Sequence, residues 1–125
     1  MTGGQPLIKN RKTTMREFTE PDVSEAREVL IPEVDRIVAG LPRCQFSTKR
    51  FIEVLMEDLD GEAAYEAALE TLGNDERLAR MALHGQVISV ALRNNSALKF
   101  AGFVRDNPRH TDPYSHSSWW RKEKA

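Results

Sequence analysis

The chain has 125 residues, of which 40% are hydrophobic and 30% charged, and its formal net charge is −1. This length suits one domain with a hydrophobic core, and no apolar run approaches the roughly 20 residues that a transmembrane helix needs. The start of the chain lacks the apolar core of a signal peptide and the lone Cys44 permits no internal disulfide, so we expect a cytoplasmic protein without membrane contact.

Charge is distributed unevenly along the chain. Residues 1–16 carry +4 without any acidic side chain, residues 17–76 carry −11, and residues 77–125 carry +6. Such asymmetry is typical of proteins that bind a polyanion at one end. The alternative is that acidic helices and basic loops are ordinary solvated surface.

The N-terminal third predicts an arm and a long helix. Residues 1–17 are polar and lack periodicity, which predicts a disordered basic arm before a single domain over residues 18–125. The first helix is expected from Pro21 and Asp22 to Gly40, with Pro32 kinking it or dividing it into two helices that share a face. Its apolar stripe has helical spacing: Val23, Ala26, Leu30, Val34, Ile37, Val38 and Leu41.

The middle of the chain predicts a short edge strand over residues 43–47 and three further helices. Ser47 has the features of an N-cap, with Phe46 and Phe51 as a hydrophobic staple. The second helix is expected to bury Leu59 and to stop at residues 60–61, and the third to cover residues 62–72 and end at Gly73. An Asn74-Asp75 cap then opens a helix from residue 76 whose expected core side is Leu78, Met81 and Ala82.

The C-terminal part predicts the end of that helix and a hairpin. Gly85 indicates a bend or a close backbone contact. Four residues are expected to face inward, Val87, Ile88, Ala91 and Leu92, and four outward, Gln86, Ser89, Arg93 and Asn94. Residues 98–105 and 118–122 are predicted strands, with a bulge at Gly102 and a mobile, proline-containing tip between them.

This order of elements predicts a mainly α fold with a small antiparallel β-hairpin. It resembles the winged helix-turn-helix superfamily, with a helix inserted before the recognition helix. The resemblance rests on element order and on residues 84–122, and it implies that this helix enters the DNA major groove while the hairpin, or wing, straddles the backbone or minor groove. Carried over by residue, it implies that Gln86, Ser89 and Arg93 lie at base edges with Asn94 beside them. It also implies that five cations meet phosphates: Lys99, Arg105, Arg109, Arg121 and Lys122.

The chemistry of these residues suits the implied role. Arginine pairs bidentately with guanine, and glutamine can pair with adenine. We therefore expect a double-stranded DNA-binding domain, a regulator or a subunit of a DNA-acting assembly, whose cations gather on one exposed surface. The alternative is a protein-interaction adaptor with the same fold, whose contact surface is its acidic helices, which suit a basic protein partner, together with the flank of Val87 and Val90.

Other chemistry-bearing residues favour packing over catalysis. One residue of the Trp119-Trp120 pair is expected to anchor the hairpin on the core, because neighbouring strand residues point to opposite faces. His84 is expected at the helix surface or partly buried. The tip has residues of metal-ligating types but no rigid element to hold them, so no metal or other cofactor is predicted: His110, Asp112 and His116. No phosphate-binding loop, nucleophile elbow or His-Glu-x-x-His motif occurs, which predicts a protein that is not an enzyme.

Overall fold

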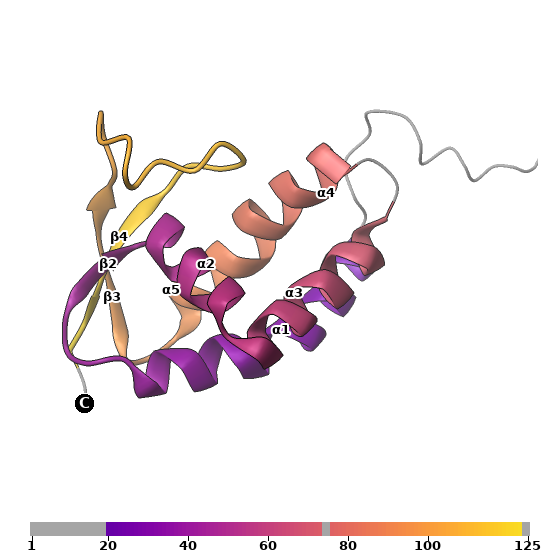
Figure 1. Cartoon of the computed structure of the whole chain (residues 1–125), viewed down its shortest axis with the longest axis horizontal. Helices are drawn as coiled ribbons and strands as arrows, with labels where there is room; N and C mark the ends of the chain where they lie inside the picture. Colours follow the sequence, from indigo (N-terminus) through magenta and orange to yellow (C-terminus); the bar gives the residue numbers. More distant parts are fainter. Residues whose placement is uncertain (1–19, 74–75, 124–125) are drawn as a thin grey trace, which may run out of the picture.

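The structure, a computed structural model, describes residues 20–73 and 76–123. Its elements in chain order are α1 (Glu20–Gly40), β2 (Gln45–Ser47), α2 (Thr48–Glu57), α3 (Leu59–Leu72), α4 (Glu76–Ala82), the π-helical turn η2 (Leu83–Ile88), α5 (Ser89–Asn94), β3 (Leu98–Phe103) and β4 (Ser118–Lys122) (Figure 1). The predicted class, mainly α with a small antiparallel sheet, is confirmed. The arm over residues 1–17 and the Asn74-Asp75 cap lie outside the described residues. None of the described helices combines the length and apolarity needed to cross a bilayer.

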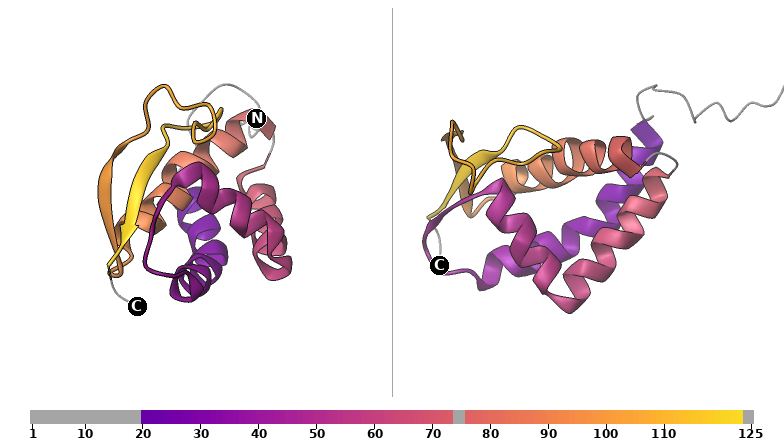
Figure 2. Two further views of the ribbon diagram at one scale, coloured as in Figure 1. Left: turned by 60° about the vertical axis from the view of Figure 1, so that its left-hand side comes forward. Right: turned by 45° about the horizontal axis from the view of Figure 1, so that its top comes forward.

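The sheet has three antiparallel strands in the order β2-β4-β3. It stands at one end of the molecule, and the helix formed by α4, η2 and α5 runs toward it from the end of α3 (Figures 1 and 2). The predicted bulge is confirmed, since the pairing of β3 with β4 shifts between Phe100 and Phe103, and Gly102 has a φ of 105°. A side chain there would be strained, which explains the glycine.

α1 forms as one helix of 21 residues, including Pro32. The predicted stripe is buried from Val23 to Val38, and Leu41 is half-buried. Pro32 has no backbone N–H, so the carbonyl of Glu28, four residues earlier, lacks its helical hydrogen bond. Both residues are exposed. Because water can satisfy that carbonyl, the proline does not divide the helix.

The boundary between α2 and α3 was predicted wrongly. Asp58 ends α2 and caps α3, accepting a hydrogen bond from the Gly61 amide at 2.7 Å. Leu59, expected in the core, is 83% exposed. Gly61 is not a helix stop but a close contact, because a Cβ there would lie 2.5 Å from the backbone oxygen of Leu55.

β4 joins the hairpin to the helices through its inward side chains. The Trp120 indole is buried and donates to the Thr48 hydroxyl at 2.9 Å, while Trp119 lies on the other face and is partly exposed. The prediction that one tryptophan anchors the hairpin is thus confirmed.

Lys122 also points inward. Its ammonium donates to the backbone oxygens of Val38 at 2.8 Å, Ala39 at 3.1 Å and Leu41 at 2.5 Å. α1 has no basic residue in its own last turn, so Lys122 supplies the positive charge that a helix C-terminus favours.

Replacing Lys122 with methionine is expected to lower the free energy of unfolding by about 1–3 kcal/mol, because buried carbonyls lose their donor. Urea denaturation measures the change. The control is Lys99→Met, at a side chain that is 62% exposed, for which we expect a change within about 0.5 kcal/mol. Equal effects of both substitutions would contradict a capping role.

Candidate nucleic-acid interface

α4, η2 and α5 form one continuous helix whose middle is a π-helical turn. Ala79, Ala82 and Leu83 are buried, and regular α spacing would next bury Gln86 and Val90. The extra residue of the π turn moves the buried positions on by one, so that Val87, Ile88, Ala91 and Leu92 enter the core instead. The four residues predicted to face inward are confirmed.

The opposite side of this helix is exposed near its two ends and at Gln86. Gln86, Arg93 and Asn94 are exposed as predicted, and Arg77 joins them. Met81, predicted inward, is 40% exposed, whereas Ala79 takes the core position. Arg77 lies outside residues 84–122, on which the resemblance rests, so it was not among the predicted contacts; in helix-turn-helix proteins that bind DNA, the N-terminal residues of the recognition helix commonly contact bases.

Ser89 does not belong to this exposed face. It is 9% exposed, and its hydroxyl donates to the His84 carbonyl oxygen at 2.8 Å. The π turn places this carbonyl within reach, because the Ser89 amide bonds to it as well. The predicted base contact by Ser89 is therefore wrong.

The tip of the hairpin is fastened to the middle of the helix. His84 Nδ1 lies 2.8 Å from the Asp112 carboxylate, and both side chains are buried, 6% and 3% exposed. Asp112 also accepts from the Ser115 hydroxyl at 3.1 Å and the Tyr114 amide at 3.0 Å. Gly85 faces Ser115, with space for a Cβ at ordinary contact distance.

A second part of the tip rests on the start of α2. His110 Nδ1 lies 2.8 Å from the hydroxyl of Ser47, the α2 N-cap, and its ring packs on Trp119 with centroids 4.6 Å apart. The Ser117 hydroxyl accepts from the Lys49 amide. The sequence predicted a mobile tip, but the structure shows a loop that contacts the rest of the fold at two places, His84 and the start of α2.

The bond between helix and tip extends into a buried polar chain. Tyr65 Oη lies 2.7 Å from His84 Nε2 and accepts from Arg80 at 2.8 Å. Because an ionised carboxylate can only accept, His84 Nδ1–H donates to Asp112, and the other ring nitrogen, Nε2, meets the Tyr65 hydroxyl. His84, expected at the surface or partly buried, is 4% exposed.

Tyr65, His84 and Asp112 are arranged as a hydroxyl, a base and an orienting carboxylate, as around an activated nucleophile. The hydroxyl, however, is not accessible from solvent. Tyr65 is 1% exposed, and burial raises the pKa of its hydroxyl, which keeps it protonated. No substrate can reach Oη in this arrangement. The hydrogen-bonded series Tyr65–His84–Asp112 therefore holds the hairpin against the helix.

Acid is expected to release this contact. Burial opposes ionisation of Asp112, but hydrogen bonds from His84, the Tyr114 amide and Ser115 hold its pKa below the ordinary value. Because the pKa of Asp112 is lower in the folded state than in the unfolded state, where it is about 3.9, the ionised carboxylate stabilises the fold at any pH above the unfolded-state pKa. This stabilisation is lost as the pH falls through the pKa of the folded state. The loss of stability caused by Asp112→Asn should therefore shrink as the pH falls below about 5 in urea titrations; a constant difference would contradict this assignment.

The predicted phosphate-binding cations do not form one cluster. Lys99 and Arg121 are cross-strand neighbours at the base of the hairpin, and both lie near Glu123, at 4.0 and 3.1 Å. Arg105 and Arg109 are exposed in the tip. Lys122 is buried under α1 and cannot meet a phosphate, so that prediction is wrong. The expectation of one continuous cationic surface is not met.

Aromatic side chains occupy part of the hairpin surface instead. Phe100 and Phe103 are 42% and 45% exposed, and His116 stacks on Phe103 with centroids 4.6 Å apart. His116 is thus separated in its contacts from His110 and Asp112. Among the described residues, no three His, Cys, Asp or Glu side chains are placed to hold a metal ion.

A scan of protein-family models and searches of curated proteins and of solved structures found no match to this chain.

Proposed function

We propose that the protein binds double-stranded DNA as a winged-helix domain, as a regulator or as a subunit of a DNA-acting assembly. The helix of α4, η2 and α5 would enter the major groove and present Arg77, Gln86, Arg93 and Asn94. The hairpin would meet phosphates through Lys99, Arg105, Arg109 and Arg121. Binding is non-covalent and needs no cofactor.

The observation that supports this proposal most is topological. The helix that directly precedes β3 exposes polar side chains near its two ends and at Gln86, and the hairpin after it is fastened beside that helix by the His84–Asp112 contact. The sheet order β2-β4-β3 places the hairpin next to the short strand before α2. A rigid pair of helix and hairpin suits a groove and its flanking phosphates. Fold alone does not establish function, so the proposal depends on a binding test.

Titration of the full chain with a fluorescent random-sequence duplex provides that test. If the four hairpin cations each neutralise one phosphate, log K should fall with log salt with a slope of about −3.5. Pairing of Lys99 and Arg121 with Glu123 would reduce the slope to about −2. No binding at low salt would refute the proposal.

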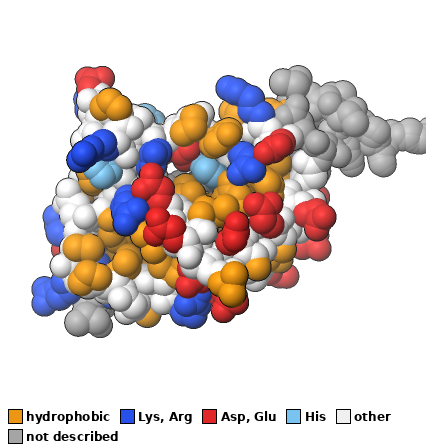
Figure 3. Space-filling model, in the orientation of Figure 1, with side chains coloured by type: hydrophobic (Ala, Val, Ile, Leu, Met, Phe, Trp, Pro, Cys, Tyr) orange, Lys and Arg blue, Asp and Glu red, His pale blue; other side chains and the backbone are white. Residues whose placement is uncertain are grey.

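A second candidate function, a protein-interaction adaptor, is favoured by the exposed aromatic residues. Phe100, Phe103 and His116 form a contiguous cluster, and clustered aromatic residues are enriched at protein interfaces. The acidic side chains over α2 and α3 (Figure 3) would suit a basic partner. This candidate predicts no duplex binding, so the same titration separates the two.

A further inference from the structure

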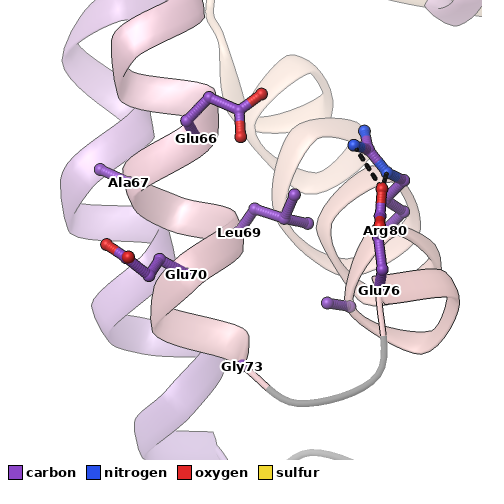
Figure 4. Close-up of a pocket in the computed structure, with 8 residues that line it drawn as sticks. Glu66, Ala67, Leu69, Glu70, Gly73, Glu76 and Arg80 are labelled. Atoms are coloured by element: carbon purple, nitrogen blue, oxygen red, sulfur yellow. Dashed lines mark hydrogen bonds and ion pairs between the residues drawn. The ribbon is translucent and has the colours of Figure 1, made fainter.

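A groove lies between α3 and α4, on the side of α3 opposite α1. Its volume is about 640 Å³, and Figure 4 shows Leu69 pointing from α3 across the gap toward α4. Ala67 and Ala79 add small apolar surface to its lining. The groove is open to solvent along one side.

Carboxylates surround this apolar floor. Glu66 points from α3 toward α4, whereas Glu70, which also lines the groove, points away from α4 (Figure 4), and neither forms an ion pair with another described residue. Across the gap, Glu76 is already neutralised by Arg80, with 2.8 Å between guanidinium and carboxylate. The groove therefore has one unpaired carboxylate, Glu66, facing its apolar residue Leu69 and a second, Glu70, on the outer side of α3, which suits a chain segment with cationic and apolar residues.

We propose that residues 1–16 of this same chain dock in the groove between α3 and α4. This segment carries Lys9, Arg11, Lys12 and Arg16 without any acidic residue. Leu7 and Ile8 directly precede Lys9 and supply apolar side chains that can cover Leu69. The inference does not depend on DNA binding.

The described structure ends within reach of the groove. α1 packs along α3, and the start of α1 lies beside the end of α3 in both Figure 1 and Figure 2. Gly73, at that same end of α3, lines the groove. The separation to be crossed is about one helix diameter, 10–12 Å, whereas the seven residues between Lys12 and Glu20 can span roughly 25 Å.

The covalent connection favours this occupant over a separate peptide. A tethered segment with a short linker has an effective concentration on the order of millimolar, so weak charge pairs are enough for occupancy. Exposed pairs are worth about 0.2–1 kcal/mol each, which makes docking sensitive to salt.

Paramagnetic broadening in the full chain tests the proposal. The chain has one cysteine, so Cys44→Ser with Thr13→Cys allows a single spin label in the segment. The expected result is loss of amide signals at Leu69, Gly73 and Ala79, with recovery of those signals at about 0.5 M salt, where charge pairs are screened.

Matched variants make the result specific. Glu66→Gln with Glu70→Gln should restore the signals, whereas Glu57→Gln with Glu62→Gln, two exposed acids elsewhere on α2 and α3, should not. Chemical-shift dispersion confirms that each variant is folded. Broadening that spares the groove, for example because the label approaches the hairpin instead, would overturn the proposal. Broadening of the groove that persists in Glu66→Gln with Glu70→Gln would overturn it as well.

Discussion

Replacing Asp112 with alanine is expected to lower the free energy of unfolding by about 2–4 kcal/mol. The substitution removes the acceptor of His84 Nδ1–H, which is buried and has no other partner in the polar chain. An unsatisfied buried donor costs about 1–3 kcal/mol, and the lost hydrogen bond to a charged acceptor adds to this. Urea denaturation at neutral pH measures the change.

The matched controls are Asp112→Asn and Asp106→Asn. Asparagine at position 112 keeps an oxygen that can accept from His84, so its effect should be smaller than that of alanine. Asp106 is an exposed tip residue with a φ of 47°, a conformation that asparagine tolerates, so little change is expected. If the alanine variant were as stable as the Asp106 control, the tip would not be fastened by this bond.

The second large effect concerns duplex binding. Arg77→Ala combined with Arg93→Ala is expected to weaken binding by about 2–5 kcal/mol, if each arginine contributes 1–3 kcal/mol at a base edge or phosphate. Both side chains are exposed at opposite ends of the same helix. Fluorescence anisotropy with one duplex at fixed salt measures the loss.

The control for this pair is Arg36→Ala. Arg36 is also exposed, but its guanidinium pairs with Asp58 and Glu33 where α1 meets the start of α3, away from the proposed interface. It should leave binding unchanged. Equal losses of duplex affinity in Arg36→Ala and in the double variant would indicate a general charge effect. No loss of affinity in the double variant would show that the helix is not part of the interface.

Local patterns in the sequence predicted most of the fold. The stripe of α1, the Ser47 cap and its Phe46–Phe51 staple, and the bulge at Gly102 each depend on residues close in sequence. Leu59 was misplaced because Asp58, which can end one helix and cap the next, was not recognised as the boundary.

The site was less predictable because its contacts join distant residues. His84 meets Tyr65 and Asp112, 19 and 28 positions away, and Lys122 caps a helix more than 80 positions earlier. No local spacing indicates such pairs. The π turn could be suspected from the sequence, since the apolar positions shift by one between Leu83 and Val87, and that shift buries Ser89.

The most direct test of the account is an amide chemical-shift map of the full chain during titration with a DNA duplex. The account predicts that the perturbed amides lie in residues 76–94, on the side of Arg77, Gln86 and Arg93, and in the hairpin near Arg105 and Arg109. Perturbation confined to α2 and α3 or to the Phe100–Phe103 surface, or no perturbation at low salt, would contradict it.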